Sequence, residues 1–131
     1  MFRFIALIPI ALWLISLVVP AVGGKNDVGM GWQVLLIGWL GILNAQFGWF
    51  ANIAFVWSIP IVMNDRQPSS RTQVILSLGL VIPALQTLFW TEIHTHEGNS
   101  PVIVLVGYYF WLAAMLSQVV FLNAAKRSSE E

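Results

Sequence analysis

The two histidines of the chain lie two residues apart in one polar segment, at His94 and His96. Glu92 and Glu97 flank them. In an extended segment, residues two apart project to the same side, so both imidazoles could reach one ion. Imidazole nitrogen together with a carboxylate oxygen suits zinc or copper. One hypothesis is therefore a metal-binding or metal-responsive protein that uses these four residues.

A plainer interpretation is that this segment is a hydrated connection between two helices. Structural and catalytic metal centres draw on a larger ligand set, and the rest of the sequence supplies no further histidine and no cysteine. This interpretation predicts a protein without a bound cofactor. Imidazole also gains its proton just below neutral pH, so a pH-sensing loop is a third alternative.

The chemistry that is missing excludes several classes of protein. Without cysteine there is no disulfide, no thiolate metal site and no thiol nucleophile. The long apolar stretches contain no Asp, Glu, Lys, Arg or His, the groups that proton relays and ion-coupled carriers need at membrane depth. Intramembrane proteolysis would need an acidic pair or a serine with a histidine there. No basic stripe could neutralise nucleic-acid phosphates. We therefore expect no enzymatic activity and no nucleic-acid partner.

The composition indicates that the lipid bilayer is the main partner of the chain. Of the 131 residues, 58% are hydrophobic and 9% are charged, whereas soluble domains average about 25% charged residues. A soluble fold of this size could not bury so much apolar surface. The sequence predicts an all-α integral membrane four-helix bundle that forms one transmembrane domain over residues 1–131.

Four apolar stretches are the expected helices, at about 4–22, 32–63, 72–91 and 101–125. The first resembles a signal peptide, but it exceeds the usual apolar core of about 7–15 residues, so we expect it to be retained. The second, if helical throughout, would extend about 48 Å, too long for one untilted crossing. We expect it to tilt, to protrude or to break, and the polar and glycine residues at 44–48 are where a break would fall.

The basic residues predict the orientation. Five of the six fall on one side if both termini are cytoplasmic: Arg3, Arg66, Arg71, Lys126 and Arg127. Only Lys25 falls on the other side. Because cytoplasmic loops are enriched in Lys and Arg, both termini of this multi-pass membrane protein are expected inside. A bacterial inner (plasma) membrane is the preferred location, and the same rule also fits a eukaryotic membrane.

A stripe of small residues marks the second stretch. On a helical wheel Gly38, Gly41, Ala45, Gly48 and Asn52 fall within one arc. Small residues let membrane helices approach closely, so this arc is expected to pack against another helix of the bundle, a second copy or a larger membrane protein. The first functional hypothesis is accordingly a non-enzymatic helper or subunit of a membrane complex.

Polar and aromatic side chains complete the second stretch. Asn44 and Gln46 could form a small hydrophilic pocket for a lipid headgroup or a small polar ligand; the plainer interpretation is hydrogen bonding across helices, with Gln86 and Gln118 as partners. A further alternative is a pore-modulating toxin or immunity protein, in which Asn44 and Gln46 would line a pore formed by an oligomer. The tryptophans expected deepest in the bilayer are interpreted as packing residues: Trp13, Trp39, Trp49 and Trp111.

Overall fold

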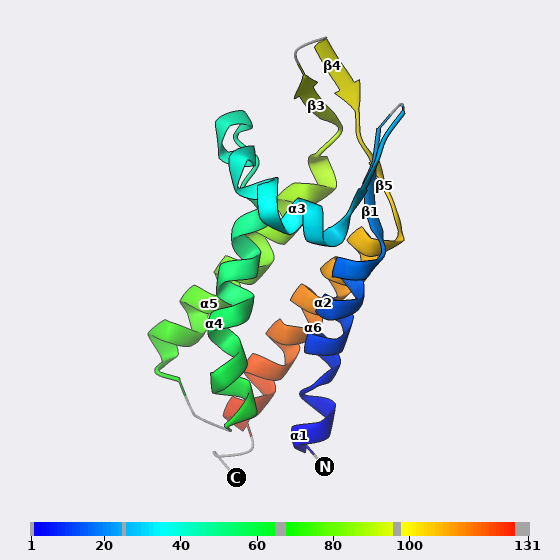
Figure 1. The fold of residues 1–131 in the computed structure, drawn as a ribbon. Coiled ribbons are helices and arrows are strands. Elements are labelled where there is room, and N and C mark those ends of the chain that lie inside the picture. The colour runs from blue at the N-terminus through cyan, green and yellow to red at the C-terminus, as the bar shows by residue number, and fades with distance from the viewer. Residues whose placement is uncertain (1, 25, 65–67, 96–97, 128–131) are drawn as a thin grey trace.

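The computed structural model describes residues 2–24, 26–64, 68–95 and 98–127 (Figure 1). The α-helices are α1 (Phe2–Ile5), α2 (Ile8–Val18), α3 (Gly31–Ile37), α4 (Ala51–Met63), α5 (Ser70–Gln86) and α6 (Val106–Arg127). The 3-10 helices are η1 (Gly38–Asn44), η2 (Gly48–Phe50) and η3 (Thr87–Phe89). The strands are β1 (Pro20–Gly23), β2 (Val28–Met30), β3 (Glu92–Thr95), β4 (Gly98–Pro101) and β5 (Ile103–Val104). The described chain is mostly helical, which confirms the all-α prediction in outline.

The strands make two of the helices shorter than hydropathy predicts. The first helix ends at Val18, not at residue 22, and Val19 is extended with φ −111° and ψ 159°, because the ring of a following proline, here Pro20, disfavours helical backbone before it. The fourth helix begins at Val106, not at residue 101. Residues 103–104 pair with β1 in the antiparallel sheet β2-β1-β5, and β3 pairs with β4 in a separate hairpin.

The third helix differs less from the prediction of 72–91. It starts at Ser70, where the hydroxyl of Ser69 accepts a hydrogen bond from the backbone N–H of Thr72 at 3.2 Å. Such a side-chain cap satisfies one of the N–H groups that a helix start leaves without a partner. The helix continues as η3 and ends at Phe89.

The second apolar stretch is divided into α3, η1, η2 and α4, and the two halves are separated by residues 45–47, called the break below. Ala45 has left-handed backbone with φ 55° and ψ 30°. The carboxamide of Gln86 holds the break, because its Nε2 donates to Ala45 O and its Oε1 accepts from Phe47 N–H, both at 2.7 Å. A single helix over 32–63 is therefore wrong, and the chain leaves helical geometry inside the segment 44–48.

Helix α6 packs against α2, α4, α5 and β1, and α4 packs against α5 (Figure 1). Both chain ends lie at one end of these helices, the strands lie at the other, and α3 crosses the strand end. Small residues on α4, α5 and α6 let the three helices approach one another. The fully buried core comprises Ala51, Phe55, Leu80, Ala84, Ala114, Met115 and Leu122.

Two helical stretches, 70–89 and 106–124, are long and apolar enough to cross a membrane by length and composition. Within an apolar window of 18 residues in each stretch, only 28% and 33% of the residues are buried inside the protein. The apolar helices over 8–18, 31–43 and 48–63 are shorter. Large hydrophobic side chains are exposed along all of these elements, including Leu14, Leu43, Trp57, Ile75, Phe89 and Val120.

Candidate functional site: a cavity beside α3 and η1

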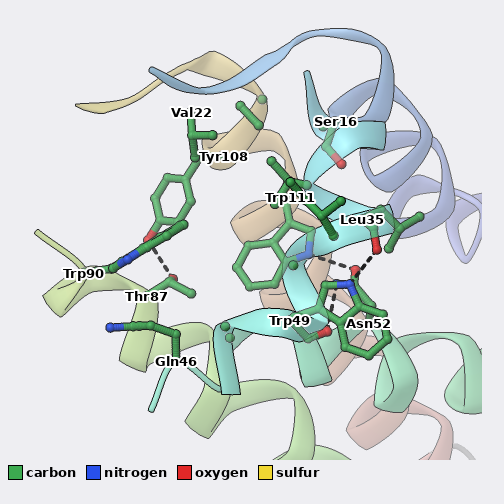
Figure 2. A pocket seen from close by; sticks show the side chains of 18 of the residues that line it. Ser16, Val22, Leu35, Gln46, Trp49, Asn52, Thr87, Trp90, Tyr108 and Trp111 are labelled. Atoms are coloured by element: carbon green, nitrogen blue, oxygen red, sulfur yellow. Dashed lines mark hydrogen bonds between the residues drawn. The ribbon is translucent and has the colours of Figure 1, made fainter. Parts of the chain in front are cut away.

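A cavity of about 300 Å³ lies toward the strand end of the helices (Figure 2). Residues of α3 and η1 form one wall, and residues of α2, β1, the η2–α4 segment, η3 and α6 form the others. The lining is mostly aliphatic and aromatic. Among the described residues that line the cavity, Glu92, which is exposed, is the one with a carboxylate, and none is Lys, Arg or His. The cavity therefore suits a ligand that is mainly apolar.

Gly31 lets the α3 wall join the rest of the fold. A Cβ atom at this position would lie 1.8 Å from the backbone oxygen of Ser16 on α2, far inside contact distance. Its N–H donates to Val19 O at 3.1 Å. Only glycine permits this approach, so α3 starts directly against the end of α2.

Asn52 is the polar centre of the deep end of the site. Its Oδ1 accepts the indole N–H of Trp13 at 2.9 Å and that of Trp111 at 3.0 Å. Its Nδ2 donates to Trp49 O at 2.9 Å (Figure 2). The side chain is buried, with 8% exposed. One carboxamide thus joins α2, α4 and α6, and the indole of Trp49 joins this group to α3 by donating to Leu35 O at 2.7 Å.

A hydroxyl pair forms the opposite side of the cavity (Figure 2). Thr87 Oγ1 donates to Ala84 O at 2.6 Å and lies 2.9 Å from the phenol oxygen of Tyr108. Nearby, Trp90 donates its indole N–H to the backbone oxygen of Glu92 at 3.1 Å. These contacts fix the orientation of Tyr108 and Trp90, which both line the cavity.

The five residues of the predicted stripe do not share one helix face, because the break separates them. The wheel assumed a continuous helix, and Ala45 is exposed with left-handed backbone in the middle of it. A Cβ at Gly38 would lie 2.7 Å from Trp49 Cδ1, and one at Gly41 would lie 3.1 Å from Gln46 O. These two glycines therefore make room for Trp49 and for the backbone of Gln46, which belong to the same stretch of the chain.

The lower part of the stripe packs inside the protein. A Cβ at Gly48 would lie 2.2 Å from Thr87 Cγ2 and 3.3 Å from Pro83 O, so this glycine brings η2 against α5. Asn52 is the hydrogen-bonding centre described above. Within the described residues, Gly48 and Asn52 therefore contact other helices of the same chain.

The amide residues are distributed differently from the expectation. Gln46 lines the cavity, and no hydrogen bond of its side chain is found within the described part of the chain. Asn44 ends η1, and its side chain lies outside what the structure describes. Gln86 bonds to the backbone of the break instead of to another amide side chain. Gln118 is buried, with 1% exposed, and its Nε2 donates to Ser58 Oγ at 2.7 Å. Neither residue of this pair lines the cavity.

The predicted metal ligands are only partly described. Glu92 and His94 belong to β3, in which His94 pairs with Asn99 of β4. His96 and Glu97 lie outside the described residues. Over 2–24, 26–64, 68–95 and 98–127 there is no group of three His, Cys, Asp or Glu side chains that could hold a metal ion. A zinc or copper site stays a prediction from the sequence.

The aromatic residues of the site were undervalued from sequence. Their depth in the apolar stretches predicts packing roles for Trp13, Trp49 and Trp111, yet each donates a hydrogen bond that organises the site. A usable signal was present: indole N–H groups at membrane depth need acceptors, and the apolar stretches contain few polar side chains. Thr87 and Tyr108 lie 21 positions apart, and no local pattern connects them.

Comparison with protein-family models, with curated proteins and with solved structures finds no match to this chain.

Proposed function

We propose that this chain is a non-enzymatic, multi-pass membrane protein that binds a small, mainly apolar ligand in the cavity. In this role it acts as a helper or subunit of a larger membrane complex. The cavity supports this most directly. Its volume of about 300 Å³ falls at the lower end of the range of about 300–1,000 Å³ typical of ligand sites, which combine apolar walls with a few fixed polar groups. The walls here have that composition.

The arrangement of the helices supports four crossings of the bilayer. Besides α5–η3 and α6, the α1–α2 and η2–α4 segments would cross, each about 25 Å long at 1.5 Å per residue, slightly short of a hydrocarbon core of about 30 Å. A locally thinned bilayer accommodates such lengths. The chain ends, the end of α4 and the start of α5 lie at one end of the helices (Figure 1).

The basic residues then favour an orientation in the bacterial inner membrane. Arg3 and Arg71 belong to the end that carries the termini, and Lys25 lies in the chain between two strands of the opposite end. Because basic residues accumulate on the cytoplasmic side, we place both termini in the cytoplasm. The strands and the cavity would then lie toward the outer face.

Residues 31–47 support access to the cavity from lipid. This segment carries no charge, and large apolar side chains are exposed along it, namely Trp32, Leu36, Ile37, Trp39, Leu40, Ile42, Leu43 and Phe47. Such side chains favour the membrane interface, where indole rings are enriched. A wall of the cavity would thus lie in the outer leaflet, and an apolar ligand dissolved in that leaflet would reach the site without crossing water.

The test is binding of neopentylbenzene to the purified full chain in lipid nanodiscs, followed by calorimetry and corrected with empty nanodiscs. Val34 lines the cavity from α3, so Val34→Trp should fill it and reduce affinity at least tenfold. Leu36→Trp is the matched control, because Leu36 is on the same helix, is exposed and does not line the cavity. Equal binding by both variants would contradict the proposal, and so would a native chain that binds neither this probe nor a charged probe of the same size.

A further inference from the structure

The indole rings that line the cavity have already used their hydrogen-bond donors. Trp49, Trp90 and Trp111 each donate the N–H to a protein oxygen, at 2.7, 3.1 and 3.0 Å. A ligand therefore meets their π systems and gains no N–H donor from them. The phenol ring of Tyr108 lies beside Trp111, with ring centroids 6.1 Å apart. Four aromatic side chains thus line this one cavity.

The hydroxyl pair is also arranged to accept. Thr87 has one hydroxyl proton, and at 2.6 Å this proton is directed to Ala84 O. In the 2.9 Å contact, Tyr108 must then be the donor and Thr87 the acceptor. The phenol oxygen is left with lone pairs and no free proton. Thr87 and Tyr108 can therefore accept hydrogen bonds from a ligand but cannot donate to it, whereas the neutral carboxamide of Gln46, which also lines the cavity, can do both.

The side chains around the cavity also favour a positively charged ligand over a negatively charged one. Lys, Arg and His do not occur among the described residues that line the cavity. An anion would lose water and gain in exchange the neutral carboxamide of Gln46, but no cation and no indole donor. A cation is attracted by the negative faces of aromatic rings, most strongly by Trp. Aromatic faces, accepting oxygens and the lack of a basic side chain among the described lining residues together favour a cation over an anion.

We propose that the ligand of this cavity is a small apolar cation: a quaternary ammonium or protonated amine attached to an apolar group. This inference rests on the proposed function, since it names the class of molecule that the cavity binds. The size is consistent, because an engineered apolar cavity of about 150 Å³ already holds benzene, and this cavity has about 300 Å³. A trimethylammonium group joined to one aromatic ring is a ligand of the expected size.

The experiment uses a matched pair of probes. Benzyltrimethylammonium and neopentylbenzene have nearly the same shape, and they differ in a positive nitrogen replacing a neutral carbon. Binding of each to the full chain in nanodiscs is measured by calorimetry against empty nanodiscs, so that partition into lipid is subtracted. We expect the cation to bind at least fivefold more tightly than the neutral probe. Phenylacetate, an anion of similar size, should not bind.

Two variants locate the effect. Trp90→Leu removes an aromatic face whose only recorded hydrogen bond goes to a nearby exposed residue, and it should weaken the cation at least fivefold while changing the neutral probe less than twofold. Trp32→Leu, at an exposed indole outside the cavity, should change neither. Equal affinity for both probes, or binding of phenylacetate, overturns the inference and leaves the proposed function standing. Failure of all three probes overturns the proposed function as well.

Discussion

Replacing Asn52 by leucine tests how the site is held together. The substitution keeps a side chain of similar size but removes the one oxygen that accepts both indole N–H groups, at 2.9 and 3.0 Å. Trp13 does not line the cavity, so its N–H loses its only recorded acceptor. A buried donor left without an acceptor costs about 1–3 kcal/mol. Trp111 lines the cavity, where water can hydrate its N–H after the substitution. Losing the hydrogen bond from Trp111 to Asn52 therefore costs only the net free energy of one hydrogen bond, about 0.5–1.5 kcal/mol.

The two contributions predict that Asn52→Leu lowers the free energy of unfolding by about 1.5–4.5 kcal/mol. This exceeds the average of about 0.6 kcal/mol for hydrogen bonds between membrane helices, because one acceptor serves two donors here. The measurement is reversible unfolding in mixed micelles by titration with sodium dodecyl sulfate, followed by near-ultraviolet circular dichroism of the tryptophans.

A double-mutant cycle with Trp13→Phe isolates the stranded donor. In the Trp13→Phe background there is no N–H to strand, so Asn52→Leu should cost about 1–3 kcal/mol less than in the native chain. An equal cost in both backgrounds, within about 0.3 kcal/mol, would refute the reasoning. It would mean that the Trp13 indole is hydrated or finds another acceptor when Asn52 is lost.

Three further substitutions test the break and the contact that follows it: Gly48→Ala and Ala45→Gly are measured by the same unfolding titration, and Gln86→Leu by amide hydrogen exchange. Gly48→Ala should cost about 1–3 kcal/mol, because Thr87 is held by two hydrogen bonds and cannot turn away from the new methyl; Gly24→Ala, whose nearest contact is at 3.9 Å, should change stability by less than about 0.5 kcal/mol. Gln86→Leu removes both bonds to the break and should speed amide hydrogen exchange there while leaving the middle of α6 protected; unchanged exchange in the break would contradict its role as a clamp. Ala45→Gly should leave stability unchanged or raise it by up to about 1 kcal/mol, since glycine adopts left-handed backbone without strain; a loss of about 1 kcal/mol, the usual effect of this change in a helix, would argue against this conformation.

Hydropathy predicted the helical class of the chain and the positions of the apolar stretches, because lipid-exposed surface must be apolar along its whole length. It could not predict the strands. Residues 20–23 and 103–104 pair across about eighty positions, and apolar residues in a short strand look the same as apolar residues at the end of a helix. Pro20 gave the one local warning, since a helix predicted to run to residue 22 had to pass through it.

The candidate site was predictable only in fragments. The polar residues at 44–48 indicated irregular backbone, and Gln46 and Asn52 were singled out, but the wheel gave them the wrong neighbours because it assumed one helix. What makes the cavity is the combination of distant residues: Asn52 with Trp13 and Trp111, and Thr87 with Tyr108. Such pairs depend on how the helices pack, which hydropathy and spacing do not contain.

The central position of α6 has a consequence for biogenesis. The helix α6 follows the other described helices in the sequence, and it supplies the main packing partner of α2 and part of the core shared with α4 and α5. Before α6 has been made, α4 can already pack against α5, but the interior cannot close and Asn52 lacks its second indole partner, Trp111. Closure of the core thus waits for the synthesis of residues 106–127, and a product shortened before residue 106 would be left open to membrane quality-control proteases.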